Sequence, residues 1–263
     1  VWNPSNPEQY NDNFYGANLT HPLENMARTE NNKNNSNRLI ATGKAEITFL
    51  PELKLKSTFT LDRDYNNTTN FLDPIKTSWG RNQYGEGYDG RSLSTILVFD
   101  NILTYNKSIK KHNFDVMVGS SWTGSKWSQS YINGSHYMNG DIQTLNAANK
   151  ISWNGTGTSA SEWAIMSFVG RLAYNYDSKY LLTVNMRSDG SSKLHPDHRW
   201  GTFPSVSAAW RISSEEFMKD YSWINDLKLR GGWGQTGNQS GLGDYARRRE
   251  GRLPEAASGQ AGA

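Results

Sequence analysis

Two short stretches of the sequence carry side chains that could do metal or acid–base chemistry. His195-Pro196-Asp197-His198 offers two imidazoles and a carboxylate, which are ligands that zinc accepts. The proline and the expected loop position give these groups no fixed geometry, so a metal site is disfavoured. Glu215-Glu216 could be the pair of carboxyls that hydrolyses a glycoside. Neighbouring carboxyls diverge, however, and after Ser213-Ser214 they fit the capped first turn of a helix better.

Two glycine-containing stretches give no better case for catalysis. Asp189-Gly190-Ser191-Ser192 lacks the strained elbow of a nucleophilic serine and is typical of a tight turn. The run from Gly231 to Gly237 lacks the Lys-Ser/Thr pair and the following helix of a phosphate-binding loop. It is better explained as glycine in a strand where backbones approach closely. We therefore predict no catalytic residue, no cofactor and no metal, and hence not an enzyme.

Aromatic residues in the stretches predicted as loops are the remaining candidates for a binding function. Aromatic faces can stack on sugar rings, and neighbouring Asn and Asp side chains can bond hydroxyl groups. The alternative, which we favour, is that these rings pack the loops on one another or contact a protein partner. The candidate substrate-binding residues are Trp79, Tyr84, Tyr88, Trp127, Tyr131, Tyr137 and Trp153.

The composition excludes several classes of protein. The chain has 263 residues, a mean hydropathy of -0.76 and 12% aromatic residues, and a disordered chain would lack those aromatics. The net charge of +3, with no basic block except near the end, gives no support for nucleic-acid binding. Cysteine is absent, which excludes disulfides and thiolate sites. The sequence also contains no apolar run of about 18 residues, as a membrane-spanning helix would need.

A transmembrane β-barrel is compatible with this composition, because its strands alternate polar and apolar residues. The chain opens at Val1-Trp2 without a signal-peptide pattern. We interpret it as a trimmed chain or as a piece of a longer protein.

Alternation of apolar and polar residues predicts eight strands. In the first, Leu39, Ile47 and Phe49 share one parity, and charged residues share the other. Long polar and aromatic stretches at 64–91 and 123–161 are predicted as loops. Short helices are expected at about 22–28 and 215–221. The strands are expected at about residues 39–50, 53–62, 93–105, 114–122, 165–176, 180–187, 202–212 and 226–235.

The connections alternate between short and long. In an up-and-down sheet every second turn lies at the same end, so one end is expected to carry tight turns and the other long loops. We expect Pro51 and Ser178 at one end and Trp79, Trp153 and His195 at the other. Outer-membrane barrels have this asymmetry. The alternative is a soluble, secreted β-sandwich that binds carbohydrate, which also has alternating strands and aromatic loops.

Several ordered sequence blocks between Gly170 and Tyr245 resemble the barrel of SusC/RagA-type TonB-dependent outer-membrane transporters of Bacteroidetes. The blocks are Tyr174-Asn175-Tyr176, Lys179-Tyr180-Leu181-Leu182, Arg187 with Asp189-Gly190-Ser191-Ser192, Arg199-Trp200-Gly201 with Phe203-Pro204-Ser205, Ala209-Trp210-Arg211, Glu216-Phe217-Met218, and Leu227-Lys228-Leu229-Arg230 to Gly237-Asn238-Gln239. They cover about 75 residues. The strands before them fit the architecture with weaker motifs.

This resemblance implies an all-β fold: an antiparallel up-and-down transmembrane β-barrel, of which the chain holds about eight strands out of about 22. It implies import of glycans or peptides across the outer membrane, with a SusD-like surface lipoprotein as partner. The TonB complex would act through a plug domain that this sequence lacks. We accordingly divide the chain into a loop or extracellular segment (1–37), a partial barrel (38–245) and an atypical tail (246–263).

The resemblance also assigns the two faces of the sheet. The apolar parity is expected to face outer-membrane lipid, and an isolated sheet would expose it in water. The tail from Arg247 is rich in Ala, Gly and Arg, and we expect it to join no strand; a flexible loop of the family is the alternative. The polar parity is expected to face the lumen and the plug, through Lys44, Glu46, Lys54, Lys56, Thr58, Thr183, Asn185 and Arg187.

Overall fold

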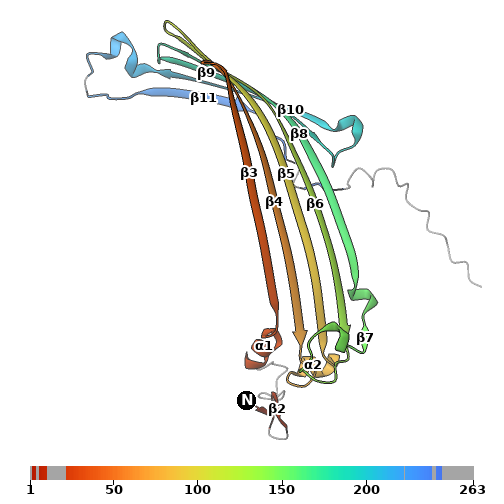
Figure 1. Ribbon diagram of the computed structural model, residues 1–263. Coiled ribbons are helices and arrows are strands. Elements are labelled where there is room, and N and C mark those ends of the chain that lie inside the picture. Colours follow the sequence, from red (N-terminus) through yellow and green to blue (C-terminus); the bar gives the residue numbers. More distant parts are fainter. Residues whose placement is uncertain (1, 4–5, 11–21, 222, 239–240, 245–263) are drawn as a thin grey trace, which may run out of the picture. The chain divides into compact units, whose positions relative to one another are not determined.

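The computed structural model describes residues 2–3, 6–10, 22–221, 223–238 and 241–244 (Figure 1). Contacts divide the chain into two units. Unit 1 contains residues 1–40, 62–95 and 126–161, and unit 2 contains residues 41–61, 96–125 and 162–263. The expectation for the tail from Arg247 falls outside the described residues.

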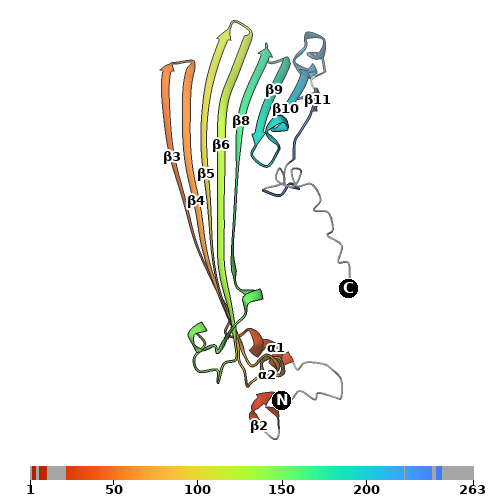
Figure 2. The ribbon, with the colours of Figure 1, turned by 90° about the vertical axis from the view of Figure 1, so that its right-hand side faces the viewer.

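The described residues form one large antiparallel sheet in which the eight long strands follow chain order (Figures 1 and 2). The predicted up-and-down order is therefore confirmed. The sheet is open, with β3 and β11 at its edges. A two-residue strand, β7 (Lys150–Ile151), pairs with the end of β6, and β1 (Trp2–Asn3) pairs with β2 (Asn6–Tyr10) separately. The long strands are β3 (Lys33–Leu50), β4 (Leu53–Leu72), β5 (Glu86–Ile109), β6 (His112–Ser135), β8 (Gly157–Tyr176), β9 (Tyr180–Ser191), β10 (Trp200–Arg211) and β11 (Lys228–Gly234).

Four strands are much longer than predicted. β4 and β8 have 20 residues each, and β5 and β6 have 24 each. The loops predicted at 64–91 and 123–161 shrink to residues 73–85 and 136–156. The prediction was wrong here because it required an apolar face, whereas backbone pairing alone continues these strands through polar and aromatic sequence.

Helical elements are short. α1 (Pro22–Thr29) lies where a helix was expected, and α2 (Ser78–Gln83) lies in a stretch predicted as loop. The helix predicted at 215–221 is replaced by two 3-10 turns, η4 (Ile212–Ser214) and η5 (Glu216–Met218). Glu215 has extended backbone, and its carboxylate accepts hydrogen bonds from other segments instead of starting an α-helix. The remaining 3-10 turns are η1 (Leu145–Ala147), η2 (Trp153–Gly155) and η3 (Pro196–His198).

Among the described residues, the longest and most apolar helices still fall short of what crossing a membrane requires.

The tight turns of unit 2 lie next to one another. Asn106 N donates to Glu52 O at 2.9 Å, and Asp177 N donates to Lys111 O at 2.8 Å. The β8–β9 register pairs Tyr176 with Tyr180 and Ile165 with Ser191, so Ser178 and His195 lie beyond opposite ends of β9. This part of the predicted topology is confirmed. In unit 1, α2 and η2, which carry Trp79 and Trp153, lie in the connections at the other ends of their strands.

The sheet of unit 2 has one apolar and one polar face. In the register of β8 to β11, Leu172, Val184, Val206 and Trp233 form one cross-strand row, and each is 40–59% exposed. No second sheet covers this row among the described residues, which argues against the sandwich alternative. Among the residues that the structure describes, the few buried apolar ones are Ala27, Phe71 and Tyr137, and all three belong to unit 1.

Paired side chains line the polar parity. Arg38 donates to both oxygens of Asp62, from Nε at 2.8 Å and from Nη2 at 2.6 Å. Asn185 Nδ2 donates to Ser205 Oγ at 3.1 Å, and Arg187 Nη2 donates to Ser167 Oγ at 3.0 Å. Two residues expected on the polar face, Lys54 and Glu46, form an ion pair at 3.9 Å. Several side chains of the polar face therefore bond to one another across strands.

Aromatic rings form two rows on the apolar parity of unit 2. Near the tight turns, the rings of Tyr176, Tyr180 and Trp210 follow one another at centroid distances of 6.3 and 6.5 Å. Near the other end, Phe168 stacks on Trp200 at 5.9 Å. Trp200 and Trp210 are ten residues apart on β10, which is about 33 Å of strand. A strand tilt of about 40°, as in outer-membrane barrels, would place the two rows about 25 Å apart in height, which is the height of the apolar band of such barrels.

Candidate functional site

Helix α2 holds one candidate aromatic residue, Trp79, in a tightly bonded loop of unit 1. Thr77 caps the helix, since its hydroxyl oxygen accepts a hydrogen bond from Gly80 N at 3.0 Å. Before it, Asp73 Oδ1 accepts from Ile75 N at 2.8 Å and from Lys76 N at 2.9 Å. The helix ends at Gln83 and is followed by its C-cap residue Tyr84, whose φ of 57° is left-handed. These bonds fix the loop between β4 and β5 from its own polar groups.

Helix α1 is tied to α2 by a buried carboxylate. Glu24 has 0% relative exposure, and its Oε1 accepts from Ser78 N at 2.6 Å and from Ser78 Oγ at 2.5 Å. Arg28 Nη2 lies 3.9 Å from the same oxygen. A carboxylate that accepts from the first N–H groups of a helix stabilises that end. Glu24 therefore joins the segment before β3 to the β4–β5 loop.

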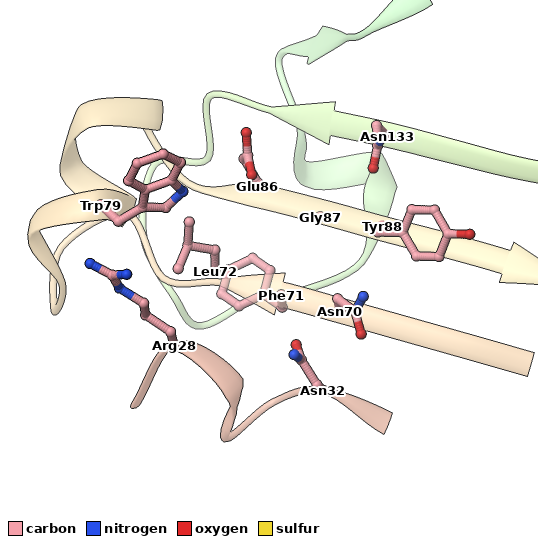
Figure 3. A pocket seen from close by; sticks show the side chains of 10 residues that line it. All are labelled: Arg28, Asn32, Asn70, Phe71, Leu72, Trp79, Glu86, Gly87, Tyr88 and Asn133. Carbon is pink, nitrogen blue, oxygen red and sulfur yellow. The ribbon is translucent and has the colours of Figure 1, made fainter. Parts of the chain in front are cut away.

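A pocket of about 380 Å³ lies between these elements (Figure 3). The guanidinium carbon of Arg28 lies 5.7 Å from the ring centroid of Trp79, so a cation covers part of that ring. The amide groups that line the pocket can donate and accept hydrogen bonds, and its rings offer flat apolar faces. Such a lining suits a polar solute with both hydroxyl or amide groups and apolar faces. The pocket is lined by Arg28, Asn32, Asn70, Phe71, Leu72, Trp79, Glu86, Gly87, Tyr88 and Asn133.

Two of the seven predicted aromatic residues, Trp79 and Tyr88, line this pocket. The other five do not. Tyr88, Trp127 and Tyr131 lie in strands, although they were predicted in loops. Trp127 is half-buried in β6, and Trp153 is 87% exposed in η2.

Ring packing accounts for most of the remaining aromatic residues. Tyr131 stacks on Tyr88 at 6.5 Å, and Tyr84 stacks on His136 at 4.9 Å. Tyr137 meets Phe71 edge to face at 5.0 Å and is 5% exposed. Burial raises the pKa of the Tyr137 hydroxyl above its usual value. The packing alternative of the sequence analysis thus describes more of these rings than a binding role does.

Sequence patterns did not predict the residues that complete the pocket. Arg28 lies in the helix that was expected near residues 22–28, but nothing linked that helix to the β4–β5 loop. Asn70 and Asn133 lie in stretches predicted as loops that are ends of β4 and β6. Asn is so frequent in this chain that no single Asn gave a signal.

The other motifs serve structural roles. His195 Nδ1 lies 3.3 Å from Asp197 Oδ2 beside η3, and the described residues contain no cluster of three or more groups suited to hold a metal ion. Glu215 accepts from Tyr180 Oη at 2.7 Å, Lys179 Nζ at 2.9 Å and Trp210 Nε1 at 3.0 Å. These hydrogen bonds lower the pKa of the Glu215 carboxyl to about 2.

In the glycine-rich strand β11, the prediction of close approach between strands fits Gly234. A Cβ on Gly234 would lie 2.8 Å from Ser205 Cβ on β10, whereas a Cβ on Gly231 would meet nothing within 4 Å. Gly234 is thus required by its neighbour, and the described residues do not explain Gly231.

Comparison with known proteins identifies relatives over most of the chain. No family model matches the sequence. The TonB-dependent receptor SusC of Bacteroides thetaiotaomicron is 33% identical over 245 residues, which cover 88% of this chain and 23% of that receptor. The TonB-dependent receptor P39 of Formosa agariphila is 39% identical over 147 residues, which cover 56% of this chain and 14% of that receptor. The chain thus spans less than a quarter of the length of these curated relatives.

A solved structure agrees with this result in its fold. The RagAB peptide transporter has a TM-score of 0.76 and 24% identity, and the match covers 90% of this chain and 26% of that chain. The receptors named above belong to the family that the sequence blocks between Gly170 and Tyr245 resemble. The open antiparallel sheet is close to the RagAB barrel fold. The chain therefore belongs to the SusC/RagA-type TonB-dependent receptors.

Proposed function

We propose that the chain is part of a longer outer-membrane transporter that imports glycans or peptides. The observation that carries this proposal is the two-sided sheet of unit 2. Its apolar face is exposed between two aromatic rows about 33 Å apart along the strand, which suits a bilayer if the strands tilt by about 40° as in outer-membrane barrels. Its other face carries paired polar groups, as the lumen of a barrel does.

The proposed partners follow from the family. A SusD-like surface lipoprotein would cover the loop end of the receptor, and the TonB complex would supply energy through a segment outside this chain. Trp153 is 87% exposed and is a candidate contact for the lipoprotein. Trp79 and Tyr88 are the candidate contacts for solute, because they line the pocket of unit 1. The solved relative is described as a peptide transporter, which supports import of an oligomeric solute.

Deletion of the gene that carries this sequence would test the proposal. We expect the source bacterium to lose growth on one glycan or peptide from a panel of single nutrients, and growth to return with the intact gene. The tagged receptor should occur in the outer-membrane fraction and should bring a surface lipoprotein with it in detergent. A soluble protein, or unchanged growth on every nutrient, would contradict the proposal.

A further inference from the structure

The pocket of unit 1 has a buried negative charge directly behind its one lining cation. Of the ten lining residues, Arg28 and Glu86 are charged. Arg28 reaches from α1 toward Trp79 in Figure 3, and Nε of Arg28 is buried without a hydrogen-bond partner in the described part of the chain. Glu24 lies behind it at 3.9 Å and has a side-chain exposure of 1%. The positive charge that a solute meets in this pocket is therefore already compensated.

The carboxylate of Glu24 does more than a helix cap needs. Its Oε1 takes both hydrogen bonds from Ser78, while its Oε2 is buried without a partner among the described residues. A neutral amide oxygen could accept the same two hydrogen bonds from Ser78, although more weakly. What the carboxylate adds is a negative charge in a site where burial weakens solvent screening.

We propose that Glu24 determines the charge selectivity of this pocket. By compensating Arg28, it leaves the pocket suited to an uncharged part of a solute and repels carboxylate or sulfate groups. Specificity of this kind arises from an unfavourable interaction with the wrong ligand. The proposal rests on the proposed function, since it takes the pocket to be a solute contact, and it makes Glu24 a specificity-determining residue that does not itself touch the solute.

Binding of a matched pair of probes to the full-length receptor in detergent tests this. Hexagalacturonate carries a carboxylate on every ring, and maltohexaose is its uncharged counterpart with the same number of rings. Isothermal titration should show that Glu24→Gln binds hexagalacturonate at least about tenfold more tightly than wild type does. In the double variant Glu24→Gln/Arg28→Met this gain should disappear, because the uncovered cation is gone.

Two control variants separate charge from loosening of the helices. Ser78→Ala removes the Oγ hydrogen bond to Glu24 but changes no charge, so it should leave the preference against hexagalacturonate as in wild type. Glu30→Gln removes an exposed carboxylate that pairs with Lys76 at 3.4 Å outside the pocket lining, and it should also have no effect. Thermal unfolding of each variant in the same detergent shows whether it is folded.

The outcomes are decisive in both directions. Equal affinity of Glu24→Gln and wild type for hexagalacturonate would overturn the proposal, as would a gain that survives in the double variant or appears in Ser78→Ala. Loss of growth on deletion together with an unchanged charge preference would leave the proposed function standing and remove this inference. Unchanged growth on deletion, together with tighter binding of hexagalacturonate by Glu24→Gln, would remove the transport proposal alone.

Discussion

The two units share the same long strands but differ in whether their apolar side chains are covered. In unit 2 the sheet is a single layer whose apolar side chains, such as Val184 and Val206, remain exposed. In unit 1 the loops fold back on the strand ends and bury Phe71, Tyr137 and Glu24. The difference shows where each region finds its apolar partner. Unit 1 supplies that partner from its own side chains, and unit 2 requires one from outside, which a bilayer would provide.

The largest expected effect is on the association state of the isolated 263-residue chain. Its apolar face and its open edges at β3 and β11 should drive association in water. Gel filtration in plain buffer should give aggregates, and detergent above its critical concentration should reduce their size. A sharp monomer peak without detergent, with cooperative unfolding, would contradict the membrane assignment.

A charge placed on either face of β9 should separate the two faces. Val184→Arg lies on the apolar parity about midway between the two aromatic rows, and it should cost about 2–4 kcal/mol of folding free energy in phospholipid vesicles. Thr183→Arg, one residue earlier on the polar parity, should cost much less. Urea unfolding of the full-length receptor in vesicles measures both. Equal costs would mean that the two faces meet similar surroundings.

Unit 1 should respond to packing rather than to lipid. A Cβ on Gly87 would lie 2.1 Å from the Tyr137 hydroxyl oxygen, so Gly87→Ala should destabilise the loop end by about 1–3 kcal/mol. Tyr137→Phe removes that oxygen, which has no partner among the described residues, and should restore part of the loss in the double variant, since Cζ would still lie 2.9 Å from the new Cβ. Gly43→Ala, where a Cβ meets nothing within 4 Å, is the matched control. Protease resistance of the 136–156 loop reports the change.

The smallest effect is expected at the tight turns and depends on pH. Hydrogen bonds from Tyr180, Lys179 and Trp210 lower the pKa of Glu215 from 4.5 to about 2. Since the folded pKa is depressed, this stabilisation is present above about pH 4.5 and is lost as pH falls toward 2. Glu215→Gln should flatten the dependence of the unfolding free energy on pH between about pH 4.5 and 2. Glu216→Gln, whose carboxylate is bonded to Lys219, should change it less, and an identical profile for both would argue against the Glu215 site.

The sequence predicted the fold where a face is apolar and failed where neither face is. The alternation of apolar and polar residues located all eight long strands. Their order was predicted without any information on conservation. The pattern ended near Asp62 in β4, yet the strand continues to Leu72 because its neighbours still accept its backbone groups. The pocket could be predicted only in part. Trp79 and Tyr88 were visible as aromatic residues, but the contact of Glu24 with Ser78 joins positions 54 residues apart and has no local signal.

The tight turns of unit 2 also share a repeated ion pair. Lys107 near the end of β5 binds Glu52 at 2.6 Å, Lys111 binds Asp177 at 2.7 Å, and Lys179 binds Glu215 at 2.9 Å, so each pair joins one hairpin to the next. The first two pairs are more exposed than the third, and exposed pairs contribute about 0–1 kcal/mol each and are screened by salt. Their value lies in register, because sliding a strand by one residue would exchange its two faces. A hairpin that paired with its neighbour in a register shifted by one residue would leave its lysine without the matching carboxylate. This row of ion pairs therefore favours the correct register of each hairpin in the sheet.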